Sequence, residues 1–162
     1  MNRIKHKLIL YLILLFSIFA LIAAYFIQYI LGHQPCNLCL IERIPYISII
    51  IVITFCLTFK KFEKNSFIFL SLIFLFALMI SFYHFGIEQG FFNESLVCDL
   101  KNSGYKILTT EELLNELKKR TISCKDVTFT IMGLSLATIN TIVSLVLSVI
   151  TFKVYLNYEK NK

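Results

Sequence analysis

The sequence is poor in charged residues and in the residues that break helices. Asp, Glu, Lys and Arg make up 16% of its 162 residues, with only five glycines and two prolines. Soluble domains carry charge at roughly a quarter of their positions, whereas 57% of this chain is apolar. A chain of this length has too little interior to hide that much apolar surface from water. The composition therefore excludes an ordinary soluble domain and favours a lipid environment.

Lysine and arginine outnumber the acidic residues and give the chain a net charge of +6. Basic proteins often bind polyanions through a continuous positive surface. Here the bases form short clusters at the ends of apolar runs, where they indicate membrane orientation instead. We therefore expect no nucleic-acid partner.

Four long apolar stretches predict four membrane-spanning helices. A bilayer core of about 30 Å is crossed by about 20 helical residues, and backbone groups inside lipid must bond within their own segment, which favours helices. We therefore expect one domain over residues 1–162, an all-α four-helix transmembrane bundle. The predicted spans are 8–31, 41–59, 66–85 and 127–152, with loops at 32–40 and 86–126.

The distribution of bases predicts which side of the membrane each loop faces. Lysines and arginines gather beside both termini and between the second and third spans, and such clusters mark the cytoplasmic side. Loops 32–40 and 86–126 then face the periplasm, where disulfides persist. Four of the five cysteines lie in these two loops, namely Cys36, Cys39, Cys98 and Cys124.

The second loop contains one further pattern, a capping box at Thr109 and Glu112 followed by leucines at helical spacing. It predicts a short amphipathic helix with basic residues in its last turn. The leucine face of this helix would lie on the bilayer surface or pack on the loop itself.

Cys36 and Cys39 form a C-x-x-C motif at the mouth of the second span. Attachment of haem would require a histidine at position 40, which is leucine. A zinc site requires about four ligands, and Cys98 and Cys124 would complete such a set, so the count alone leaves zinc open. The oxidising side favours two disulfides, and we expect no metal.

Cys39 lies where the second span begins, and a helix N-terminus favours a thiolate. Arg43 follows one helical turn later. The positive charge of Arg43 would lower the pKa of the Cys39 thiol further, and its guanidinium would donate a hydrogen bond to a quinone carbonyl. Alternatively, Arg43 would extend to lipid phosphates. The neighbouring Glu42 is expected to be solvated.

His84 ends the third span, where it would relay a proton during quinone reduction or simply lie at the interface. Glu88 and Gln89 are expected to be solvated loop residues. Cys56 falls within the second span, where we expect a small packing residue.

Together these motifs resemble the DsbB family of disulfide bond formation proteins, over most of residues 8–152. One departure is Thr128-Phe129-Thr130, where many relatives have a tryptophan, which puts the local membrane anchor or loop packing in doubt. The matching residues are Cys36-Asn37-Leu38-Cys39-Leu40-Ile41-Glu42-Arg43, Tyr83-His84, Cys98-Asp99, Cys124, and Gly133-Leu134-Ser135-Leu136-Ala137 with Asn140.

The resemblance implies an inner-membrane thiol:quinone oxidoreductase. A DsbA-like periplasmic oxidase would attack the Cys98–Cys124 disulfide at Cys98. The freed thiols would exchange with Cys36–Cys39 through a Cys36–Cys124 link, and Cys39, beside Arg43, would donate electrons to ubiquinone or menaquinone. Each exchange is thiolate attack on a disulfide sulfur.

Three alternatives remain at this stage. A relative of vitamin K epoxide reductase also combines C-x-x-C with paired loop cysteines, but there the motif lies late in the chain. A zinc-stabilised membrane module without enzymatic activity would use the cysteines as ligands. In a scaffold or transporter subunit the cysteines would be structural.

Overall fold

The computed structural model describes residues 3–59, 63–93, 98, 123–125 and 129–160. The predicted four-helix membrane bundle is confirmed, because four helical segments are long and apolar enough to cross a membrane. The predicted helix near Thr109 lies outside the described residues. The elements are α1 (Arg3–Tyr29), α2 (Asn37–Ile41), α3 (Arg43–Thr58), α4 (Glu63–Glu88), β1 (Thr130–Ile131), β2 (Leu134–Ser135) and α6 (Leu136–Lys160).

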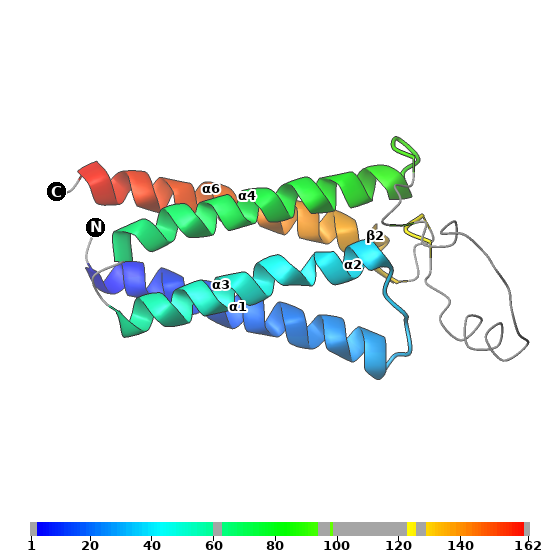
Figure 1. The fold of residues 1–162 in the computed structure, drawn as a ribbon, viewed down its shortest axis with the longest axis horizontal. Coiled ribbons are helices and arrows are strands. Elements are labelled where there is room, and N and C mark those ends of the chain that lie inside the picture. Colours follow the sequence, from blue (N-terminus) through cyan, green and yellow to red (C-terminus); the bar gives the residue numbers. More distant parts are fainter. Residues whose placement is uncertain (1–2, 60–62, 94–97, 99–122, 126–128, 161–162) are drawn as a thin grey trace, which may run out of the picture.

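The helices pack in the order α1, α3, α4, α6, with α4 and α6 in the most extensive contact. Both termini lie at one end of the bundle, and α2 and β2 lie at the other (Figure 1). Apolar side chains from all four long helices form the core, among them Leu10, Ile53, Phe74 and Val154. Cys56 belongs to this core, which confirms the prediction that it is a packing residue.

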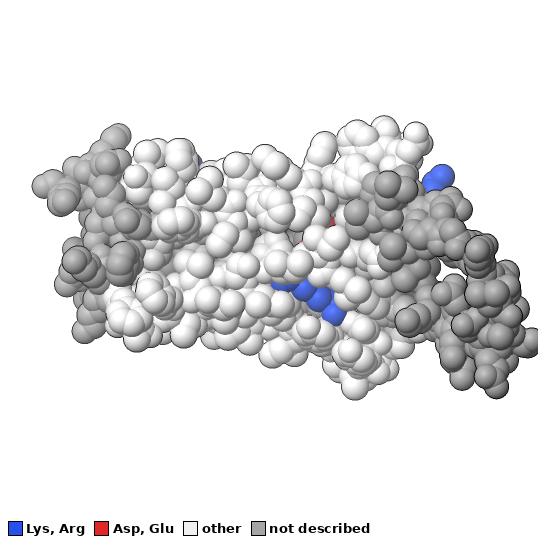
Figure 2. All heavy atoms as spheres, viewed as in Figure 1, with Lys and Arg blue, Asp and Glu red and all other residues white. Residues whose placement is uncertain are grey.

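The outer surface of the bundle is apolar as well. Leu15 and Phe19 on α1 keep 70% and 65% of their surface exposed, and the described residues on the face seen in Figure 2 are almost all uncharged. Hydroxyl groups inside the helices bond to backbone carbonyls one turn earlier: Ser81 donates to the carbonyl of Ala77 at 2.8 Å, and Thr151 donates to that of Leu147 at 2.8 Å. This is the pattern that a lipid solvent requires.

The second span is broken at Glu42, which separates α2 from α3. Pro45 explains the break, because it cannot donate to the carbonyl of residue 41 and its ring crowds that carbonyl. The N–H of Glu42 still bonds to the carbonyl of Leu38 at 2.9 Å, so the chain direction is kept. Glu42 itself keeps helical backbone angles, with φ of −62° and ψ of −17°.

The last helix begins at Leu136 rather than at Val127, where the apolar run begins. Thr130–Ser135 form a hairpin with Thr130 paired to Ser135. Its turn consists of Met132 and Gly133, with φ of 53° and 82°, the positive angles that a tight hairpin turn needs. Ser135 then caps α6 by accepting from the N–H of Thr138 at 3.1 Å. Hydropathy alone does not distinguish this hairpin from a helix.

Candidate redox site

All four predicted cysteines lie together at the end of the bundle that carries α2. Cys98 and Cys124 form a disulfide and pack in one buried cluster with Cys36, with Cys39 at its edge. The loop disulfide is therefore buried, with Cys98 and Cys124 only 5% and 2% exposed. Their burial follows from packing against Leu38 of α2 and Ile87 of α4, which belong to the same cluster.

Cys36 and Cys39 are free thiols with their sulfurs 2.8 Å apart. Cys36 is the N-cap of α2, and its sulfur accepts from the N–H of Cys39 at 3.2 Å. The two residues of the motif thus share one helical turn, and their sulfurs are close enough to join with a small movement. Cys36 is buried, whereas Cys39 is partly exposed.

The contacts that stabilise negative charge converge on Cys36. The hydrogen bond from the Cys39 thiol lowers the pKa of Cys36 to about 4, aided by the hydrogen bond and positive charge of His84 and opposed by burial. His84 Nε2 lies 3.5 Å from the Cys36 sulfur. From the sequence we expected the thiolate on Cys39, because the helix was expected to begin there. Since α2 begins at Asn37, Cys36 occupies the capping position instead.

His84 is held by a buried carboxylate. Its Nδ1 lies 2.8 Å from Glu42 Oε1, and Glu42 Oε2 accepts from Asn140 Nδ2 at 2.9 Å. Tyr46 donates its hydroxyl to Asn140 at 2.5 Å. The expectation that Glu42 is solvated was wrong, since it is 9% exposed. Its charge is compensated by His84 and Asn140, which are distant from it in the sequence.

Glu88 was also expected to be a solvated loop residue, and this too was wrong. Because α4 continues to Glu88, one turn beyond His84, its carboxylate reaches the same cluster. Oε1 lies 3.8 Å from His84 Nε2, and the side chain is 6% exposed. Ser135 of β2 donates to its other oxygen. Gln89 is exposed, as predicted.

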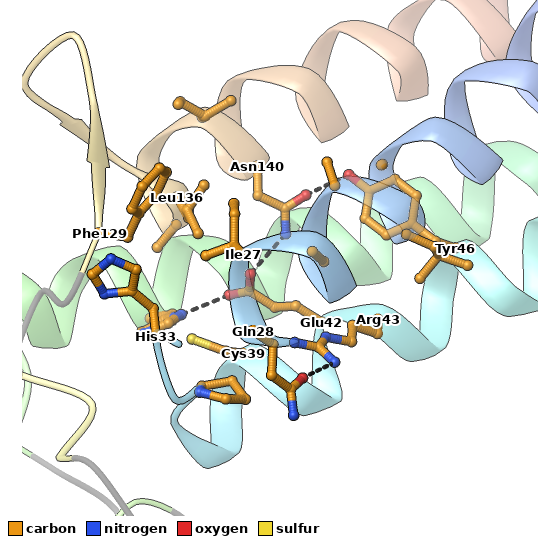
Figure 3. Close-up of a pocket in the computed structure, with 18 of the residues that line it drawn as sticks. Ile27, Gln28, His33, Cys39, Glu42, Arg43, Tyr46, Phe129, Leu136 and Asn140 are labelled. Atoms are coloured by element: carbon orange, nitrogen blue, oxygen red, sulfur yellow. Dashed lines mark hydrogen bonds and ion pairs between the residues drawn. The ribbon is translucent and has the colours of Figure 1, made fainter. Parts of the chain in front are cut away.

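A cavity of about 300 Å³ opens beside the cysteines, lined by side chains from both α1 and α6. Small residues of α1, Ala20, Ala23 and Ala24, leave room on one side. Cys39, Glu42, Arg43, Tyr46 and Asn140 lie around its polar end, as Figure 3 shows. Most of the remaining lining is aliphatic or aromatic. The cavity is therefore an apolar pocket with a thiol and a guanidinium at one end.

Arg43 is fixed at this pocket by residues of α1. Its Nη1 donates to Gln28 Oε1 at 2.7 Å, and its guanidinium lies 4.8 Å from the centre of the Tyr25 ring. The Arg43–Gln28 bond is visible at the edge of the pocket in Figure 3. Of the two sequence interpretations of Arg43, this placement favours a residue that faces a ligand site.

The cysteine pairing bears on the zinc alternative. A set of four cysteines would need Cys98 and Cys124 as free thiols, but they are joined to each other. Within the described part of the chain, the metal-ligand cluster that does form is Cys36, Cys39 and His84, whose ligand atoms lie within 4.8 Å of one another.

Comparison with known proteins agrees with this geometry. The family model for disulfide bond formation protein DsbB matches residues 6–154. An uncharacterised protein of Rickettsia prowazekii (strain Madrid E) is 25% identical over 159 residues, which cover 98% of this chain and 92% of the relative. No solved structure matches the chain. The family match spans all four helices and both cysteine pairs, and the chain therefore belongs to the DsbB family of membrane proteins for disulfide bond formation.

Proposed function

We propose that this membrane protein is a protein-disulfide:quinone oxidoreductase. It takes two electrons from a DsbA-like periplasmic dithiol protein at Cys98–Cys124, passes them to Cys36–Cys39 and delivers them to ubiquinone or menaquinone. The observation that carries the proposal is the packing of both cysteine pairs in one cluster beside an apolar pocket.

The first half of the reaction is thiol–disulfide exchange. A thiolate of the reduced partner attacks Cys98, and Cys124 leaves as a thiolate; the partner's second thiol then attacks the mixed disulfide, which releases the oxidised partner. Because the Cys98–Cys124 disulfide is buried in the cluster, the loop must move outward before a protein partner can reach it. The same packing supports the next exchange, in which the freed Cys124 attacks Cys36.

The second exchange moves the electrons to the C-x-x-C. Cys124 attacks Cys36 and releases Cys39; Cys98 then attacks Cys124, which restores the loop disulfide and leaves Cys36 and Cys39 as thiols. A thiolate with a lowered pKa stabilises the reduced pair, so the corresponding disulfide is more oxidising. The contacts of Cys36 with Cys39 and His84 therefore favour electron flow toward the C-x-x-C.

The pocket beside Cys39 fits a quinone. Small-molecule sites are mostly apolar, with a few polar groups that fix orientation, and their volumes begin at roughly 300 Å³. Here the apolar walls would enclose the ring, the membrane would hold the tail, and Arg43 would donate to a carbonyl oxygen. A quinone supplies an acceptor for two electrons and two protons. Cys39, which is less buried than Cys36, lines this pocket and would face the quinone. His84 lies between Cys36 and Glu42, where it would relay a proton.

The proposed orientation follows from the positive-inside rule. Both termini would be cytoplasmic in the bacterial inner membrane, and α2, β2 and both cysteine pairs would face the periplasm. Figure 1 supports this by separating the termini and α2 to opposite ends of the bundle. An impermeant thiol reagent applied to intact spheroplasts after reduction should label the loop cysteines, and label confined to inverted vesicles would reject the orientation.

The experiment measures quinol formed by purified protein supplied with a reduced DsbA-type protein and a soluble quinone. Cys39→Ser should abolish quinol formation, whereas Cys56→Ser, in the core, should retain it. Ala24→Phe should fill the pocket and raise the KM for quinone, while Ile22→Phe, on the exposed side of the same helix, should leave it unchanged. Turnover that persists in Cys39→Ser would reject the assignment.

A further inference from the structure

We propose that the C-x-x-C, once reduced, binds Zn²⁺ together with His84. The sulfurs of Cys36 and Cys39 and Nε2 of His84 all lie within 4.8 Å of one another. Two thiolates and an imidazole are ligands that zinc prefers. In a tetrahedral zinc site these atoms stand about 3.5–3.8 Å apart, so the separation of 3.5 Å between Cys36 and His84 already fits. The sulfurs, 2.8 Å apart, need only a modest separation to fit as well.

The surroundings of His84 are those of a metal ligand. Zinc-binding histidines usually donate their second ring nitrogen to a carboxylate, which fixes the tautomer and the ring direction. Here Nδ1 is bonded to Glu42 Oε1 at 2.8 Å, so Nε2 presents its lone pair to the two sulfurs when the ring is neutral. Glu42 is itself held by Asn140. The orientation of the His84 ring therefore supports the site separately from the distances among the three ligand atoms.

The fourth ligand would be a water, or Glu88 after a movement of its side chain. Its Oε1 lies 3.8 Å from His84 Nε2, while its other oxygen is bonded by Ser135. A carboxylate or a water in that position would complete four-coordinate zinc. A divalent cation would also compensate the negative charge that two thiolates and the buried Glu42 and Glu88 place at this end of the bundle.

Binding would depend on the redox state of the pair. A disulfide offers no thiolate, so only the reduced C-x-x-C binds. Zn²⁺ would replace the thiol proton of Cys39 and the proton on Nε2 of His84, releasing both, and no electron would move. While bound, Cys36 and Cys39 cannot form their disulfide. Zinc would therefore act as a reversible inhibitor, a consequence that rests on the proposed function, whereas the metal site does not.

The test uses full-length protein in detergent, reduced without oxygen, with Cys98→Ser and Cys124→Ser to remove competing thiols. Co²⁺ serves as the spectroscopic probe, because a thiolate-rich tetrahedral site gives sulfur-to-cobalt charge-transfer bands and intense visible bands. One equivalent of Co²⁺ should produce them, and Zn²⁺ should displace it. The same protein with Cys36–Cys39 oxidised should produce none.

Variants distinguish this site from adventitious binding. Cys39→Ser should remove the charge-transfer contribution of one sulfur, and Glu42→Gln should weaken Zn²⁺ binding by about 10–100-fold. Cys56→Ser is the matched control and should bind as before. The proposal would be overturned if the reduced protein gives no cobalt bands, or if metal binding is unchanged in both Cys39→Ser and Glu42→Gln. Because Glu42→Gln keeps all direct ligands, it remains informative if Cys39→Ser fails to fold.

Two readouts separate the metal site from the proposed enzyme activity. The cobalt spectrum needs neither quinone nor partner protein. Quinol formation by the wild-type protein should slow in Zn²⁺ and recover when a chelator is added. If cobalt binds but no turnover occurs under any condition, the proposed function fails and the metal site stands. Turnover without cobalt binding would overturn the metal site and leave the proposed function intact.

Discussion

Single side chains determine which sulfur of the C-x-x-C carries negative charge. Cys36 receives the N–H and the thiol of Cys39 together with the ring of His84. Cys39 lies within the first turn of α2, and both cysteines line the pocket. The motif and its position could be predicted from sequence, but this division could not, because His84 is 48 residues away in the chain and its contact depends on how α2 and α4 pack.

Replacing His84 tests its effect on the Cys36 thiolate. The pKa of Cys36 is lowered to about 4, so its thiolate should persist at every pH above that value. His84→Gln removes the positive charge, and the thiolate should therefore form only at higher pH. The measurement is the ultraviolet absorbance of thiolate against pH, in reduced protein with Cys98→Ser and Cys124→Ser. A transition that does not move would show that His84 has no such influence, and His33→Gln serves as the control.

Asn140 supports the buried Glu42 carboxylate. Removing its amide leaves a charged oxygen of Glu42 without a donor and the Tyr46 hydroxyl without its acceptor at Asn140. Asn140→Leu should lower the free energy of unfolding by about 1.5–3 kcal/mol, the range for hydrogen bonds to charged groups. Thermal unfolding in detergent measures this, with the exposed Ile142→Leu on the same helix as control. An equal melting temperature for both variants would argue against the network.

At the scale of elements, helix ends position the site. The existence of four spans could be predicted because long apolar runs have few other solutions. The ends could not: α4 continues to Glu88, and the run before Leu136 forms a hairpin. Hydropathy identifies segments that can lie in lipid, but it does not reveal the turn at Gly133 or the helix cap at Ser135. The longer α4 places Glu88 beside His84, and the hairpin places Ser135 where it bonds to Glu88.

Gly86, near the end of α4, makes room for the chain to turn after the helix. The N–H groups of Phe91 and Phe92 both bond to its carbonyl, and a Cβ at Gly86 would overlap the Phe92 ring. Gly86→Ala should therefore displace Phe92 from its stacking on Tyr83, which packs against the cysteine cluster. The Cys98–Cys124 disulfide should then be reduced faster by a small thiol reagent.

The double variant Gly86→Ala with Phe92→Ala supplies the control for this prediction. Without the Phe92 ring the added methyl has space, so the double variant should behave as Phe92→Ala alone. If Gly86→Ala leaves the reduction rate unchanged, the turn after α4 does not govern access to the disulfide.

At the scale of the whole molecule, the bundle brings two cysteine pairs from distant loops to one end and opens an apolar pocket beside them. The side-by-side placement of the pairs could be anticipated from topology, since both loops were expected on the same side of the membrane. Their direct packing and the burial of the loop disulfide could not, because they depend on contacts among Leu38, Ile87 and the cysteines. That packing is what permits direct exchange between the pairs.

The most direct measurement of this exchange traps the link between the loops. In protein with Cys39→Ser and Cys98→Ser, the remaining Cys36 and Cys124 should form a disulfide under mild oxidation, detected by mass spectrometry of the linked peptides. Cys56, in the core, should stay free. Quantitative Cys36–Cys124 linkage is the expected result; Cys36 and Cys124 that both remain alkylatable would contradict electron transfer between the two pairs.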